Sequence, residues 1–108
     1  MRRGDLVTVA LQGSHGKPRP ALVIQADLLA DSSHVAVLLL TTEKRDAPLL
    51  RVEIPAGEGT GLRETSWAML DRITTAPRAK VGGVIGRADT PTVQTINRLL
   101  ALVLGLAD

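Results

Sequence analysis

Residues 18–42 read PRPALVIQADLLADSSHVAVLLLTT, two apolar runs joined by a polar connection. Ala21–Ile24 and Val35–Leu40 are too continuously apolar to leave one face in water, so they predict two buried strands. Because consecutive strands usually pair as neighbours, we expect an antiparallel hairpin. Its midpoint lies near residue 30, so directly opposed residues have numbers that sum to about 60.

Three further strands are expected around this hairpin. Leu6–Leu11 is short and partly β-branched, and the turn residues of Gln12–Pro18 end it. Leu49–Ile54 alternates apolar with charged residues, as a half-exposed strand does, and Pro55–Gly61 is a glycine-rich turn. Trp67–Ile73 is the fifth strand. The pattern predicts a mainly β fold, a small barrel or twisted, mostly antiparallel sheet.

A helix is expected at the C-terminal end. Thr90 suits the N-cap, Pro91 the first helical position, and Gly105 the end of the helix. Helical spacing is followed by Val93, Ile96, Leu99, Leu100 and Val103. Since each residue steps round the axis by about 100°, the run Leu99–Leu104 is apolar on every face. One face can enter the core and the other needs a partner, so we expect a homodimer.

Composition limits what the protein can do. At 108 residues the chain is long enough for one modest core, so 1–108 is expected to form a single domain. Trp67 is the only aromatic residue, which disfavours modules that stack bases on aromatic platforms. The absence of cysteine excludes disulfides and thiol nucleophiles, and two histidines are too few for a convincing metal site.

Charge and hydropathy point to an anionic partner and an intracellular site. The formal net charge is +2, and arginine outnumbers lysine by 10 to 3. Guanidinium suits bidentate phosphate recognition, although GC-rich coding explains an arginine bias equally well. No apolar run approaches the ~18 residues of a membrane span, and no signal peptide is evident. We therefore expect a cytoplasmic protein without a membrane partner.

The hairpin register places one cation opposite one hydroxyl. Arg19 begins the second strand and Thr41 ends the third, so the two should be directly opposed and share a face. A phosphate could be gripped there from two sides, beside the loop at Gly13–Pro18. The alternative is an arginine that solvates a strand end and a threonine that merely favours β structure.

The same residues carry a family resemblance. RGDLV at Arg3–Val7, KPRPALVI at Lys17–Ile24, LTT at Leu40–Thr42 and LDRIT at Leu70–Thr74 resemble the MazF/PemK toxin family in order and spacing. The resemblance extends to the closing Leu104–Leu106 and so covers nearly the whole chain. It implies an SH3-like barrel, a homodimer, inhibition by an acidic antitoxin peptide, and a metal-independent, sequence-selective endoribonuclease without a cofactor.

The resemblance also implies roles for particular residues. The arginine of the Arg-Pro motif and the hydroxyl residue ending strand three serve the scissile phosphate in the family, and these are Arg19 and Thr41 here. Thr42 is the neighbouring hydroxyl and substitutes if the register is off by one. Further substrate contacts are expected from Lys17, Arg45 and Arg72, together with Thr42.

The acid/base group is the open question. Some members use an aspartate of strand five, here Asp71, but the arginine two residues before it is Met69 in this chain. Asp71 could accept a proton, orient Arg19, or simply pair with a neighbour such as Arg72. Family members often carry a glutamate in a longer first loop, whereas Gln12–Pro18 has no carboxylate. His15 is the loop side chain that naturally titrates near neutrality, so it either takes the place of that glutamate or has no catalytic role.

The expected chemistry uses the substrate's own nucleophile. Without a metal site or a thiolate, RNA can be cut by its 2′-hydroxyl if the protein aligns that oxygen and neutralises the charge on phosphorus. Two other functions stay open: a non-enzymatic gyrase poison of the same fold, and a non-catalytic SH3-like module that binds RNA or peptide.

Overall fold

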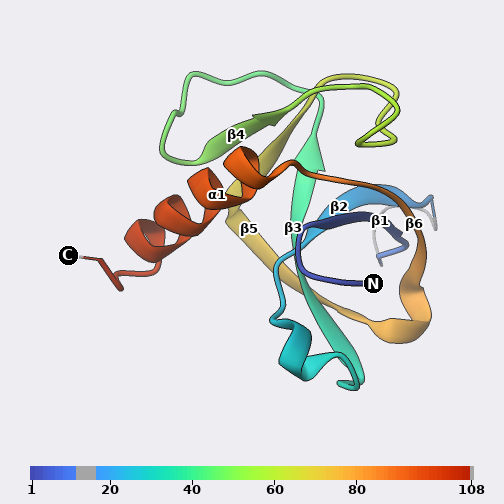
Figure 1. Cartoon of the computed structure of the whole chain (residues 1–108). Helices are drawn as coiled ribbons and strands as arrows, with labels where there is room; N and C mark the ends of the chain where they lie inside the picture. The colour runs from blue at the N-terminus through green and yellow to red at the C-terminus, as the bar shows by residue number, and fades with distance from the viewer. Residues whose placement is uncertain (12–16, 108) are drawn as a thin grey trace.

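The computed structural model describes residues 1–11 and 17–107. The strands are β1 (Asp5–Val9), β2 (Arg19–Val23), β3 (His34–Thr41), β4 (Arg51–Ile54), β5 (Ser66–Pro77) and β6 (Val81–Arg87), and helix α1 spans Thr90–Val103. Short 3-10 turns, η1 (Asp27–Leu29) and η2 (Arg78–Lys80), precede β3 and β6. The strands form one sheet in the order β4-β5-β3-β2-β1-β6 with antiparallel neighbours. Figure 1 shows this sheet strongly twisted, with α1 lying along β4 and β5. The predicted mainly β fold with a C-terminal helix is confirmed.

Alternate side chains of the central strands enter two cores. One core includes Leu6, Leu22 and Leu38, and it is closed by Ile96 and Leu100 of α1. The other core lies on the opposite side of the same strands and is formed by the following residues: Val7, Val9, Ala21, Val23, Val35, Val37 and Ala76. Burial on both sides explains why β2 and β3 are continuously apolar rather than alternating.

The register of the central hairpin is as predicted. Ala21 pairs with Leu39, Leu22 with Leu38 and Val23 with Val37, so each pair of numbers sums to 60. The connection between the strands contains η1, whose Leu28 and Leu29 are exposed. The register brings the start of β2 and the end of β3 to the same edge of the hairpin.

Strand β6 is absent from the sequence prediction. Its sequence VGGVIGR holds three glycines, which weaken any strand signal. Two of them are needed for close approach, because a Cβ on Gly82 would lie 2.2 Å from Thr8 Oγ1 and one on Gly86 would lie 2.2 Å from Thr60. β5 also runs beyond the predicted Ile73 to Pro77, and β1 ends at Val9 instead of Leu11.

The N-terminal motif ties β1 to β6. The buried Asp5 accepts hydrogen bonds from Arg2 N at 2.8 Å and from Arg87 Nη1 at 2.7 Å. Burial alone would raise the pKa of Asp5, but these hydrogen bonds and the Arg87 charge outweigh it and lower the pKa. Gly4 beside it has a φ of 92°, a conformation that favours glycine.

Helix α1 ends as predicted but begins one residue earlier. Its N-cap is Asp89, whose Oδ1 accepts a hydrogen bond from Thr92 N at 2.9 Å, so the expected capping role of Thr90 is wrong. Gly105 follows the helix with a φ of 74°. The face away from the core leaves Leu102 43% and Leu104 54% exposed. Within the described residues, no helix is long and apolar enough to cross a membrane.

Candidate functional site

One side of the sheet is hollowed by a pocket of about 630 Å³. It lies where β2 starts and β3 ends, and the first part of β5 and the start of β4 complete it. Its polar lining consists of hydroxyl and charged side chains: Arg19, Thr41, Thr42, Glu43, Arg45, Arg51, Ser66 and Arg72. Apolar contacts come from β1, β2, β3 and β5: Val9, Leu11, Pro20, Leu39, Leu40 and Met69.

Arg19 and Thr41 both border this pocket, as the hairpin register predicts. Arg19 is exposed at the first position of β2, and Thr41 is the last residue of β3. Thr41 Oγ1 accepts a hydrogen bond from Glu43 N at 3.1 Å, which fixes the oxygen and leaves the hydroxyl proton free to be donated. A permanent cation and an oriented hydroxyl therefore face one cavity.

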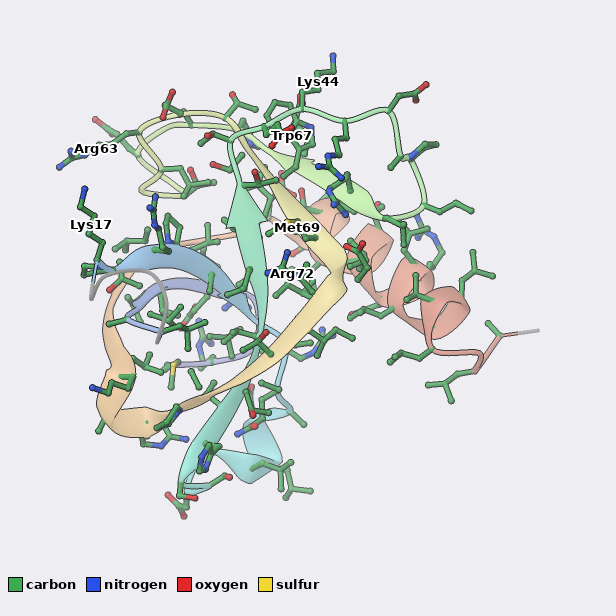
Figure 2. The ribbon with its side chains drawn as sticks, turned by 180° about the vertical axis from the view of Figure 1, so that it is seen from behind. Lys17, Lys44, Arg63, Trp67, Met69 and Arg72 are labelled. Carbon is green, nitrogen blue, oxygen red and sulfur yellow. The ribbon has the colours of Figure 1, made fainter. Side chains whose placement is uncertain are left out.

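An irregularity in β5 shapes the opposite wall. Leu38 pairs with Ile73 and Leu40 with Ala68, so Met69–Arg72 lie opposite the single Leu39. Such a bulge bends the strand and re-aims its side chains. Figure 2 shows Met69 and Arg72 at the bend of β5, and both residues border the pocket. The expected substrate contact Arg72 is thus placed at the pocket.

Positive charge dominates the lining. Among the described residues, Arg19, Arg45, Arg51 and Arg72 border the pocket, against the single carboxylate of Glu43. Glu43 lies 3.8 Å from Arg45, but both side chains are mostly exposed, and water screens such a pair strongly. The pocket is therefore suited to an anionic ligand with hydrogen-bond acceptors.

Besides Glu43 and Ser66, sequence analysis missed one arginine of the pocket, Arg51. Its side chain is only 9% exposed, and its Nη1 donates to Leu50 O at 2.9 Å and to Asp71 Oδ1 at 2.7 Å. The alternation of Leu49–Ile54 marks Arg51 as the solvated face of a strand, whereas pairing with Met69 of β5 brings it to the pocket wall. Only the pairing of β4 with β5, which is not local in sequence, shows that Arg51 lies at the pocket wall and not on a solvated face.

Asp71 pairs with a neighbour, one of the alternatives that the sequence left open, but this neighbour is Arg51 of β4. Among the described residues, the structure shows no ion pair of Asp71 with Arg72 or with Arg19. The hydrogen bond from Arg51 is the main cause that lowers the pKa of Asp71. Asp71 is 42% exposed and is not among the residues that line the pocket.

The remaining expected contacts divide into two groups. Thr42 and Arg45 border the pocket, in the segment that follows β3. Lys17 does not, and Figure 2 shows it well apart from Met69 and Arg72. His15 lies outside the described residues. In residues 1–11 and 17–107, no group of three or more His, Cys, Asp or Glu side chains could hold a metal ion.

Comparisons with known proteins agree with this geometry. Residues 2–104 match the family described as "PemK-like, MazF-like toxin of type II toxin-antitoxin system". A probable endoribonuclease MazF of Mycolicibacterium smegmatis is 45% identical over 109 residues, covering 99% of both chains. A mycobacterial endoribonuclease solved in complex with its cognate antitoxin superposes with a TM-score of 0.81 at 25% identity, covering 100% of this chain and 98% of the other.

A second solved structure shows the same fold at lower identity. The Mycobacterium tuberculosis toxin MazF-mt6 has a TM-score of 0.81 at 21% identity and covers 96% of this chain and 99% of its own. The sequence match extends over the strands that build the pocket and over the whole C-terminal helix. The chain therefore belongs to the PemK-like, MazF-like toxin family of type II toxin–antitoxin systems.

Proposed function

We propose that this protein is the toxin of a toxin–antitoxin pair and an endoribonuclease whose active site is the Arg19–Thr41 pocket. The observation that carries the proposal is the meeting of these two residues in a cavity lined by four arginines. The 45% identical relative named as a probable endoribonuclease supports the same activity. The substrate is single-stranded RNA, because its phosphates are accessible and its bases are free to enter the pocket.

The mechanism uses the 2′-hydroxyl next to the scissile phosphate. That oxygen loses its proton and forms a bond to phosphorus, while the bond from phosphorus to the 5′-oxygen of the next nucleotide breaks and that oxygen gains a proton. Arg19 stabilises the charge on the non-bridging oxygens, and the Thr41 hydroxyl donates to the phosphate and helps align it. The products are a 2′,3′-cyclic phosphate and a 5′-hydroxyl, and no metal or cofactor takes part.

The acid/base group is sought in the loop that precedes β2. We propose His15 of that loop, because histidine is the residue type whose ordinary pKa lies nearest neutrality. Asp71 is a weaker proton acceptor, because its pairing with Arg51 lowers its pKa. Base selectivity arises from the segments around the pocket, including Thr42 and Arg45.

Two protein partners accompany this activity. The exposed Leu102 and Leu104 fit a homodimer, and the cationic pocket fits an acidic antitoxin segment that competes with RNA. The structural relative solved with its cognate antitoxin supports the second partner. Such a toxin acts in the cytoplasm, where its RNA substrates are. The test measures binding of an uncleavable RNA and of the antitoxin, each in the presence of the other. If neither ligand weakens the binding of the other, the two do not share the pocket.

The direct test uses the purified protein without antitoxin. Incubation with single-stranded RNA is expected to give discrete fragments, and DNA gyrase supercoiling should be unaffected at the same concentration. Inhibition of gyrase with intact RNA would instead identify the non-enzymatic poison of the same fold. Binding of RNA with neither outcome would identify a non-catalytic RNA-binding module.

A further inference from the structure

Arg51 is a buried cation in the pocket wall, and two of its five N–H donors are already engaged. The two Nη1 hydrogens are taken by Leu50 O at 2.9 Å and Asp71 Oδ1 at 2.7 Å. Leu50 O also accepts Leu70 N at 2.9 Å, so the carbonyl that holds Arg51 is itself part of the β4–β5 connection. The guanidinium is therefore anchored on one side to the sheet and on the other to a carboxylate.

The opposite edge of the same guanidinium is unpaired. Arg51 Nε is buried and has no hydrogen-bond partner among the residues that the structure describes. Nε–H and the adjacent Nη2–H point the same way and form a two-pronged fork, the arrangement that binds two oxygens of a phosphate or carboxylate. A buried donor without an acceptor is costly in a folded protein and calls for an explanation by function.

We propose that Arg51 binds a phosphate of the RNA next to the scissile one, and that Asp71 is the positioning residue that holds Arg51 in place. This inference rests on the proposed endoribonuclease function. A pocket of about 630 Å³ lies within the range that holds whole small-molecule ligands, so it has room for more than the scissile phosphate. An RNA strand that places one phosphate at Arg19 brings neighbouring phosphates with it, and Arg51 is an anchored cation that borders the same pocket.

This assignment gives Asp71 a role other than proton transfer. A carboxylate that accepts a charged hydrogen bond at 2.7 Å stays ionised near neutrality and orients its partner. Asp71 does not border the pocket, so it acts on the RNA through Arg51. Fixing the guanidinium before RNA arrives reduces the side-chain entropy lost on binding.

The first experiment measures RNA binding at single phosphates. The probe is an oligonucleotide with the wild-type cleavage site, a 2′-deoxy sugar at the cut, and one uncharged methylphosphonate placed at each flanking phosphate in turn. Binding by the full-length protein is read from fluorescence anisotropy. One flanking methylphosphonate is expected to weaken wild-type binding by roughly tenfold. Arg51→Lys, which keeps the charge and loses the fork, is expected to bind this oligonucleotide and its all-phosphate parent with nearly equal affinity.

The salt dependence of the Kd for RNA is a second readout. It would not change if Arg51 only stabilised the fold. Loss of one phosphate contact is expected to reduce the slope of log Kd against log salt by about 0.7 for a single strand. Lys80→Gln removes one positive charge outside the pocket and is expected to keep the wild-type response to the same methylphosphonate. If the losses of binding free energy from Arg51→Lys and from each methylphosphonate simply add, Arg51 does not bind any of the tested phosphates. That result would overturn the proposal.

Asp71→Asn tests the positioning role of Asp71. It also serves as the test variant if Arg51→Lys lowers the Tm of the protein too far for binding to be measured. A higher KM, an unchanged pH profile of kcat, and a weaker response to the same methylphosphonate are expected. If Asp71→Asn instead removes the acidic limb of the plot of kcat against pH and leaves KM unchanged, Asp71 transfers a proton. That result would refute its positioning role. Cleavage by the wild type is measured first: a protein that cuts no RNA refutes the proposed function, whereas cleavage with an additive phosphate scan refutes only the Arg51 assignment.

Discussion

In the proposed mechanism, Arg19 and Thr41 have different chemical roles in the pocket. The Arg19 guanidinium supplies positive charge that can stabilise the developing oxyanion without proton transfer. Thr41 accepts from Glu43 N through its oxygen and keeps its proton for the phosphate. Both positions follow from the sequence, because an apolar run of known length fixes a hairpin register.

Substitution of these two residues should separate charge from geometry. Arg19→Ala is expected to lower the cleavage rate by about 10²-fold to 10³-fold, as loss of an oxyanion donor does. Arg19→Lys should recover only part of that loss, since ammonium cannot form the bidentate fork. Thr41→Val keeps the β-branched shape and should also slow single-turnover cleavage. Wild-type rates in folded Arg19→Ala and Thr41→Val proteins would place the active site elsewhere.

The elements that could be predicted from the sequence are those whose periodicity is local. The β2–β3 hairpin contains two continuous apolar runs, and α1 has apolar residues at helical spacing. Both elements and the register of the hairpin can therefore be predicted from the sequence. β6 is hidden because its glycines serve contacts with Thr8 and Thr60, which are distant in sequence. The bulge at Met69–Arg72 and the burial of Arg51 are hidden for the same reason, since each depends on a neighbouring strand.

The packing of β6 against the loop between β4 and β5 makes a sharp stability prediction. Gly61 has a φ of 71°, and a Cβ there would lie 1.9 Å from Ile85 O. Gly61→Ala is therefore expected to lower the free energy of unfolding by roughly 2 kcal/mol or more, through backbone strain and a steric clash. Urea denaturation followed by the fluorescence of Trp67 measures the change.

Gly83→Ala is the matched control within β6. A Cβ at Gly83 meets nothing within 4 Å, so the free energy of unfolding should change by about 0.5 kcal/mol or less. Equal urea midpoints for the wild type, Gly61→Ala and Gly83→Ala would contradict the close contact between the loop and β6.

At the scale of the whole molecule, the C-terminal end of the described chain exposes an apolar surface. Leu102, Leu104 and Leu106 are 43%, 54% and 77% exposed at the end of α1 and in the residues that follow. We predict a homodimer at micromolar concentration, because adjacent exposed leucines commonly mark an interface. Light scattering should give twice the 11.4 kDa of the chain.

Two leucine variants test where the dimer forms. Leu104→Glu is expected to raise the dissociation constant by at least about tenfold without unfolding the monomer, since the residue is 54% exposed. Leu28→Glu places the same charge on η1, where the side chain is 92% exposed, and should leave the mass unchanged. A monomeric wild type, or equal effects of the two variants, would contradict the assignment to α1.

If this pocket cuts RNA by means of the substrate's own 2′-hydroxyl, removal of that hydroxyl must stop cleavage. An oligonucleotide with the preferred site is incubated in chelator, with either a ribose or a 2′-deoxyribose at the cleaved position, and the products are weighed by mass spectrometry. The ribose form should give a 2′,3′-cyclic phosphate and a 5′-hydroxyl, while the deoxy form should bind and stay intact. Cleavage of the deoxy form at the same bond, or a 5′-phosphate product, would show that the 2′-hydroxyl is not the nucleophile.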